Sequence, residues 1–328
     1  MSWLTKIKQI SLEDTIFDSK FHPSKPNILV CVTVSGDLFI LDTDNASNPI
    51  AVELNNVHSG APIRKVAFTD DHNIITAART LKVTDFNTGK VIRKIKPDQP
   101  RSKIFSLLVI DHWLVCAGDD EGRFRAWDYR VDRGTFMDLK KSEDHISDLD
   151  IDSQKRIVVA SSGEGTLTAF NIRSRRMEEP QSELFDAGFQ CVRYYEDRGK
   201  VLVGAEDSAI NIFNIGQWGN ISDRFPVKTR LPSRKMAGNV IDSMELIGDD
   251  KYVVLGCSDG HLRLLSILPN KVIASVSDHQ TSIESLTVNK NTKVIASTDC
   301  STVHLHQFEE QNEPEKATTS SSSFFSEL

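Results

Sequence analysis

The sequence has few cysteines and lacks long apolar runs. Its five cysteines are an odd number, with no CxxC pair and no His/Cys spacing typical of a metal site. Four of them fall within expected strands, where cysteine behaves as a small buried side chain. No apolar run approaches the length of a membrane span, and the N-terminus lacks the apolar core of a secretion signal. These absences predict a soluble intracellular protein of a reducing compartment, with no membrane partner.

Catalytic signatures are also missing. There is no glycine-rich phosphate loop, no nucleophile elbow and no HExxH pair. We therefore expect no enzyme activity, no cofactor, no metal and no small-molecule substrate. The formal net charge of −7 argues against the whole body acting as a nonspecific nucleic-acid binder. Local basic patches remain compatible with that charge.

What the sequence does contain is a repeat. Short apolar strands end in a polar residue, and the first five ends are separated by steps of 43 residues. Two weaker copies follow after an insertion, so seven copies are visible. A period of roughly 40–45 residues is typical of a four-stranded propeller blade. The seven strand ends are Asp42, Asp85, Asp128, Asn171, Asn214, Ser266 and Gln307.

Each copy carries the pattern of antiparallel hairpins. The segment 118–128 is the clearest, with an acidic, glycine-bounded turn followed by a strand that ends in Trp127-Asp128. Alternating and continuous β-branched runs predict strands, and no segment has a sustained helical period. The sequence therefore predicts an all-β, seven-bladed propeller over residues 1–308. Residues 3–10 would supply the outer strand of the last blade and close the ring, which removes two open sheet edges.

Residues 309–328 differ in composition from the repeats. They are acidic and serine-rich with few apolar residues, which predicts a disordered tail. The chain ends in a Phe-Phe-x-x-Leu pattern formed by Phe324, Phe325 and Leu328. Such a terminus is either a short linear motif for the groove of a partner or an apolar end without a role.

The segment 216–235, within the fifth-to-sixth connection, is unusually basic for an acidic chain. Long loops on a rigid ring often carry function, which makes this segment a candidate partner-binding loop. The alternative is a pinned loop whose aromatics cover the ring and whose bases are solvated. The candidate partner-binding residues are Trp218, Arg224, Phe225, Lys228, Arg230, Arg234 and Lys235.

The tetrapeptide from Trp127 to Arg130 has two interpretations. In the first, Trp127 packs between blades and the motif is architectural. In the second, Trp127, Asp128 and Arg130 bind a partner, because Trp-Asp-any-Arg resembles the motif by which some propeller proteins dock on the adaptor of cullin-RING ubiquitin ligases. The protein would then be a substrate receptor of such a ligase.

The period, Trp127-Asp128 and two histidines upstream of repeat ends, His58 and His145, resemble WD40 repeats. The resemblance implies a structural role for these histidines. It also implies that His145, Ser161 and Phe170 stand where WD40 repeats place the histidine, serine and aromatic residue of a structural hydrogen-bond network. Most copies lack one or more of these residues, so we expect some blades to depend on apolar packing instead.

Several stretches narrow the match to the WD repeat-containing protein 55 family. The discriminating ones are Ser222-Asp223-Arg224-Phe225 and Leu268-Pro269-Asn270, which generic WD40 repeats do not require. This resemblance implies a nuclear, largely nucleolar protein that supports ribosomal RNA processing and large-subunit assembly. Its implied partners are ribosome assembly factors, with pre-ribosomal RNA contact, and the chain would act as a monomer within larger assemblies. The tail has Lys316 as its only lysine, so nucleolar retention would depend on partners.

Overall fold

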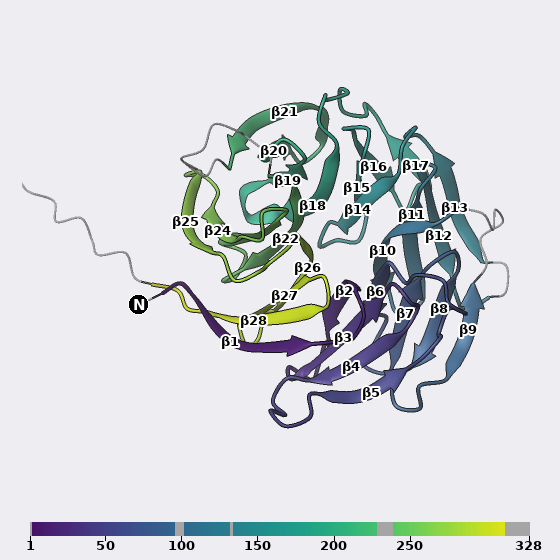
Figure 1. The fold of residues 1–328 in the computed structure, drawn as a ribbon. Helices are drawn as coiled ribbons and strands as arrows, with labels where there is room; N and C mark the ends of the chain where they lie inside the picture. Colours follow the sequence, from purple (N-terminus) through teal and green to yellow (C-terminus); the bar gives the residue numbers. More distant parts are fainter. Residues whose placement is uncertain (1, 96–101, 132–133, 228–238, 312–328) are drawn as a thin grey trace, which may run out of the picture.

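The computed structural model describes residues 2–95, 102–131, 134–227 and 239–311. Within these ranges the strands form seven four-stranded antiparallel sheets, arranged as the blades of a closed ring (Figure 1). A single 3-10 turn, η1 (Glu196–Arg198), is the helical element of the described chain. No helix in this part of the chain has the length and apolar character needed to span a bilayer. The predicted all-β, seven-bladed propeller is confirmed.

Blades 1 to 7 follow one another along the chain. The inner strands, next to the axis, are β2 (Ile16–Phe21), β6 (Lys65–Phe68), β10 (Ile104–Asp111), β14 (Ile146–Ile151), β18 (Phe189–Tyr195), β22 (Ile241–Ile247) and β26 (Ile283–Asn289). The second strands are β3 (Ile28–Thr33), β7 (Asn73–Ala77), β11 (Leu114–Asp119), β15 (Ile157–Ser162), β19 (Lys200–Ala205), β23 (Tyr252–Cys257) and β27 (Val294–Asp299).

The third strands are β4 (Leu38–Asp42), β8 (Leu81–Asp85), β12 (Arg123–Asp128), β16 (Leu167–Asn171), β20 (Ala209–Asn214), β24 (Leu262–Ser266) and β28 (Thr302–Phe308). The outer strands are β5 (Ile50–Leu54), β9 (Val91–Ile95), β13 (Thr135–Lys140), β17 (Arg176–Glu178), β21 (Gln217–Pro226), β25 (Lys271–Val276) and, for blade 7, β1 (Leu4–Ser11). Six of the seven predicted strand ends are the last residues of third strands, and Gln307 lies one residue before the end of β28.

Burial explains why the middle strands are nearly continuous apolar runs. Every residue of β11 is buried, whereas β9 at the rim is exposed or half-buried along its length. A strand covered on both faces by neighbouring blades has no solvent side on which to place polar residues. Trp127 belongs to this interior: its side chain is 3% exposed and packs with Ile75 and Val83 of blade 2. The architectural interpretation of Trp127 therefore holds.

Neighbouring blades are joined at the start of their inner strands. Ser106 Oγ donates to the carbonyl of Ile146 (2.9 Å), and Ser147 Oγ donates to that of Phe189 (2.6 Å). In the same way Ser243 Oγ donates to the carbonyl of Ile283 (3.3 Å). Each acceptor is the first residue of the next inner strand. These bonds therefore fix one blade against the next around the axis.

Close packing accompanies these bonds. A Cβ atom at Gly204 of β19 would lie 2.7 Å from Ile241 Cγ2, and one at Gly256 of β23 would lie 2.7 Å from Ile283 Cγ2. Ordinary carbon contacts are near 3.5–4.0 Å. Glycine at these positions therefore lets the first isoleucine of the next blade rest directly on the sheet.

The histidine network differs from the expectation. His58 Nε2 lies 2.8 Å from Thr76 Oγ1, and the same spacing of 18 residues recurs in His279 Nε2 and Ser297 Oγ (2.8 Å). His58 is thus held in a buried hydrogen bond, and His279, which was not predicted, makes the equivalent bond in blade 7.

The network expected in blade 4 is wrong. His145 is hydrogen-bonded to its neighbour Asp144 (3.0 Å), while Ser161 is paired with Ser147 (2.8 Å). Phe170 lies in the apolar core, stacked on Phe124 with ring centroids 4.3 Å apart. His145 directly precedes β14, and its ring packs against Phe105 of blade 3. Blade 4 is held by apolar packing and serine pairs instead.

The ring is closed by β1, as predicted. This strand is antiparallel to β28, from the pair Leu4–Phe308 to the pair Ser11–Thr302. Leu4 and Ile10 are each 3% exposed. Strands from the two ends of the described chain thus lie side by side in one sheet (Figure 1).

Deleting residues 1–11 should lower the melting temperature by about 10 °C or more. The deletion removes two buried aliphatic side chains, each worth about 2–5 kcal/mol, and exposes the edge of β28. Thermal denaturation followed by circular dichroism measures the effect. Ile7→Ala is the matched control, because Ile7 lies on the same strand but is 52% exposed, and it should melt close to wild type. A deletion variant that melts like wild type would contradict closure by β1.

Candidate functional site

A cavity in the described part of the chain lies along the axis of the ring. It has a volume of about 510 Å³ and is lined by residues of the inner strands and of the turns that follow them. Charged residues dominate its wall, and nine acids outnumber four bases. The acids are Asp18, Asp148, Asp150, Glu196, Asp197, Asp242, Glu245, Asp250 and Glu284, and the bases are Lys20, Lys65, Arg193 and Lys290.

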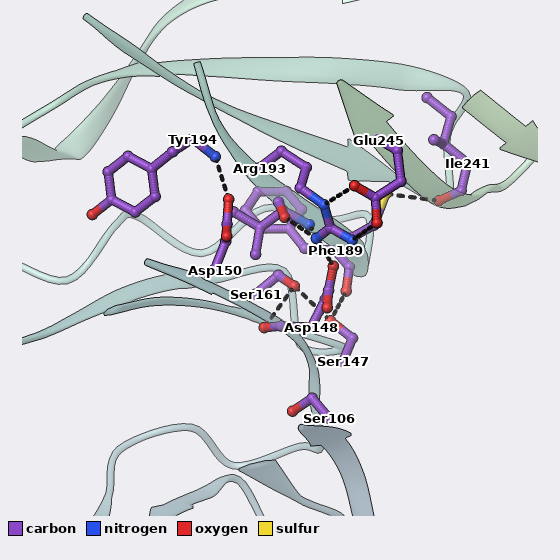
Figure 2. Close-up of polar contacts among 12 residues, drawn as sticks. Ser106, Ser147, Asp148, Asp150, Ser161, Phe189, Arg193, Tyr194, Ile241 and Glu245 are labelled. Atoms are coloured by element: carbon purple, nitrogen blue, oxygen red, sulfur yellow. Dashed lines mark hydrogen bonds and ion pairs between the residues drawn. The ribbon is translucent and has the colours of Figure 1, made fainter. Parts of the chain in front are cut away.

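Four of these residues form one network across the channel. Arg193 Nη1 lies 2.6 Å from Asp148 Oδ2, and Arg193 Nη2 lies 3.0 Å from Glu245 Oε1. Lys20 Nζ reaches the same Glu245 oxygen at 3.3 Å. The residues come from β14, β18, β22 and β2, so the network joins blades 4, 5, 6 and 1. Figure 2 shows Arg193 between the carboxylates of Asp148 and Glu245.

The channel carboxylates differ in protonation according to their partners. Burial alone would raise the pKa of Glu245, but Arg193 and Lys20 outweigh it and lower that pKa to about 2. Burial raises the pKa of Asp150 to about 6, although its carboxylate accepts the Tyr194 N–H at 2.6 Å. Burial and the nearby carboxylate of Glu284 raise the pKa of Asp242 to about 7, against the hydrogen bond from Ser282.

This arrangement favours binding and support over chemistry. The strongest charges are neutralised by one another, and within the described ranges no group of His, Cys, Asp and Glu is arranged to hold a metal ion. The inner strands that carry the channel residues are cross-linked by backbone and side-chain bonds. The channel is therefore the rigid centre of the ring.

The exposed end of the Trp127–Arg130 segment lies at the rim. Arg130 Nε and Nη2 bind the two oxygens of Asp128 at 2.9 and 2.7 Å, and its guanidinium lies 4.5 Å from the ring of Trp113. The Arg130 side chain is 59% exposed. Asp128 and Arg130 thus present one fixed polar surface, while Trp127 is inaccessible. Docking of this surface on a ligase adaptor stays a prediction.

The structure corrects part of the predicted loop at 216–235. Residues 217–226 form the outer strand β21 of blade 5, paired with β20. Trp218 is 4% exposed and packs on Val159 and Leu167 of blade 4. It is therefore a core residue, and its assignment as a partner-binding candidate is wrong.

The rest of this segment is divided between surface and undescribed chain. Arg224 is exposed and paired with Asp207, and Phe225 is half-buried against the core between blades 5 and 6. Asn270 Nδ2 donates to Asp223 Oδ2 (3.0 Å), so the two family-discriminating stretches touch. The remaining predicted residues lie outside the described ranges. These are Lys228, Arg230, Arg234 and Lys235 in 228–238, and Phe324, Phe325 and Leu328 in 312–328.

The channel network was not predicted from the sequence. The available signal was weak: two acids, Asp148 and Asp150, lie in the middle of an expected strand whose ends are isoleucines. The other members of the network are far from Asp148 along the chain: Arg193 is 45 residues away, Glu245 is 97 and Lys20 is 128. Their convergence follows from the ring, since equivalent positions of all inner strands face one axis.

Arg193→Met should destabilise the protein by about 3–5 kcal/mol. The substitution keeps the aliphatic length but leaves Asp148 without its cation and Glu245 with Lys20 alone. Denaturant unfolding measures the change. Arg198→Met is the matched control, because Arg198 lies on the same blade in the exposed turn η1, and it should change stability by less than about 0.5 kcal/mol. Equal stabilities of the two variants would contradict a stabilising role of Arg193 in the network.

Asp242→Asn should become more stabilising as the pH rises. The raised pKa of Asp242 means that the folded protein prefers the neutral acid, so wild type loses stability as the pH rises from about 4, the unfolded value, to about 7. Asparagine stays neutral throughout. The melting temperature of the variant relative to wild type should therefore rise by about 5 °C between pH 5 and pH 8, from about 2 kcal/mol of linkage. Asp186→Asn, at an exposed position, is the control, and its melting temperature should differ from that of wild type by the same amount at every pH. A pH-independent difference for Asp242→Asn would exclude the burial effect.

Known proteins identify the family. The WDR55 family model matches residues 7–309. The proteins named WD repeat-containing protein 55 homolog from Drosophila erecta and Drosophila melanogaster are each 32% identical over 293 residues, which is 88% of this chain and 55% of theirs. The homolog from Drosophila willistoni is 30% identical over the same coverage. The chain thus spans about half the length of the curated relatives it matches. The chain belongs to the WDR55 family of WD repeat proteins.

Proposed function

We propose that this protein is a non-catalytic scaffold that supports ribosomal RNA processing and large-subunit biogenesis in the nucleolus. Membership of the WDR55 family and the WD repeat propeller support a protein-interaction scaffold. The nucleolar role rests on the resemblance of the sequence stretches described above. Because the chain spans about half of its relatives' length, activities of those whole proteins come to it as proposals.

The observation that carries the scaffold role is the closed, cross-linked ring. Every inner strand contacts both neighbours, and the blades are tied by the serine-to-carbonyl bonds and the Arg193 network. A ring held in this way presents its loops at fixed separations. Fixed separations let two partners bind at once with little loss of conformational freedom in the scaffold. Ribosome assembly factors are the proposed partners, at the basic segment that continues from β21 and at the Phe-Phe-x-x-Leu terminus.

Depletion of the protein should cause precursors of the large-subunit ribosomal RNA to accumulate several-fold. The reason is that a missing scaffold slows assembly steps without abolishing chemistry. Northern blotting of precursor RNAs measures the effect, and small-subunit precursors serve as the internal control. Re-expression of the wild-type chain should restore processing and place the protein in the nucleolus. Unchanged precursor ratios after depletion would remove the proposed role.

A further inference from the structure

A second cavity lies on the face of the ring that carries the connections between successive blades. It has a volume of about 460 Å³ and is formed by residues 59–62, 64, 78–79 and 103. Three of its eight lining residues are basic, namely Arg64, Arg79 and Lys103, and none of the eight is acidic. This composition is the reverse of that of the chain as a whole, whose net charge is −7.

Arg64 is held in a fixed position at this cavity. Its guanidinium lies 4.2 Å from the ring centroid of Phe105 and 5.2 Å from that of Phe17. Its backbone N–H is bonded to the carbonyl of Ala77 (2.8 Å). A guanidinium stacked between two rings keeps its N–H edges available, in the planar fork that matches phosphate or carboxylate oxygens.

The three cations lack carboxylate partners. Within the described ranges no ion pair joins Arg64, Arg79 or Lys103 to an acid. Asp120 is near Arg64, but its carboxylate accepts the backbone N–H of Lys103 (2.8 Å). Burial lowers the pKa of Arg64. Asp120 compensates the charge of Arg64 only from a distance, and a half-buried cation without a direct ion pair would be stabilised further by an anion from a ligand.

The surroundings favour a peptide over RNA. Lys65, next to Arg64, lines the central channel, so the cavity adjoins the channel mouth. Across that mouth stand the acids Asp242 and Glu284. A uniformly anionic strand would be repelled there, whereas a peptide could place an anion in the cavity and bases against the acids. The faces of Phe17 and Phe105 that contact Arg64 are also not free to stack on nucleic-acid bases.

We propose that this cavity binds the phosphorylated serine or threonine of a partner protein whose neighbouring residues are basic. A phosphate carries about −1.5 to −2 charges and three acceptor oxygens, which suits three convergent cations. This inference names a partner chemistry for the proposed function. It rests on that function because it requires the chain to act by binding proteins.

The test is retention of the purified chain on immobilised degenerate peptides. One library has a central phosphoserine, the other an unphosphorylated serine, and a twelve-nucleotide oligouridylate is the third arm. We expect at least tenfold greater retention on the phosphoserine library than on either other arm. Arg79→Glu/Lys103→Glu should abolish this preference, and since both residues are exposed the variant should keep its wild-type melting temperature. Arg64→Lys, which keeps the charge without the planar fork, should reduce retention several-fold.

The matched control is Arg173→Glu/Arg198→Glu, which makes the same change of charge at exposed positions away from the cavity. It should retain the preference. Equal retention on the two peptide libraries, stronger retention on oligouridylate, or equal losses in the control and the cavity variant would each overturn the proposal. None of these results affects the precursor RNA measurement, so failure of this inference is distinguishable from failure of the proposed function.

Discussion

The structure depends on the contact between the start of each inner strand and the blade before it. A single four-stranded sheet with apolar residues on both faces cannot bury them alone. Here the carbonyl of the first inner-strand residue accepts a hydrogen bond from a serine of the preceding blade in blades 4, 5 and 7, and from Cys191 in blade 6. In blades 4, 6 and 7 the side chain of that residue also packs on a glycine of the preceding blade. Such contacts are local between neighbours, but they form a ring only when the last blade meets the first. The pairing of β1 with β28 provides that closure.

The charged channel is a consequence of the same geometry. Seven inner strands directed at one axis bring polar side chains into a narrow space, where each charge must find a partner or become neutral. Arg193 is paired with Asp148 and Glu245, whereas Asp242 has a raised pKa that favours its neutral form. A buried network of this kind contributes little net free energy compared with apolar packing. Its main effect is to set which blades lie opposite one another, and that gives the two faces a fixed shape.

The sequence predicted the periodic features of the fold and little of the sites. The repeat, with five strand ends at 43-residue spacing and two weaker copies, was sufficient for the blade number, and the expected strand at residues 3–10 was sufficient for closure. Trp218 was misplaced because the composition of residues 216–235 resembled a loop, whereas pairing with β20 turns its side chain onto blade 4. His145 was misplaced because it directly precedes its strand, while His58 and His279 stand 18 residues before their hydroxyl partners. The Arg193 network needs three-dimensional adjacency across four blades, which no local pattern contains.

A register shift that recurs at one position of the inner strands explains how a repetitive ring can have one distinctive face. In six blades the register shifts at the second residue of the inner strand, as in a β-bulge. In blades 3 and 6 the serine of the joint is the next residue, Ser106 or Ser243, so the second side chain can vary, whereas in blade 4 the second residue, Ser147, itself forms the joint. The side chains at the second position are Phe17, Phe105, Ser147, Gln190, Asp242 and Glu284. Aromatic residues in blades 1 and 3 hold Arg64 of blade 2, and acids occupy blades 6 and 7. The contacts between blades therefore recur around the ring, whereas the side chains at this mouth change from cationic in blade 2 to acidic in blades 6 and 7. This asymmetry can give selectivity for a partner without destabilising the fold.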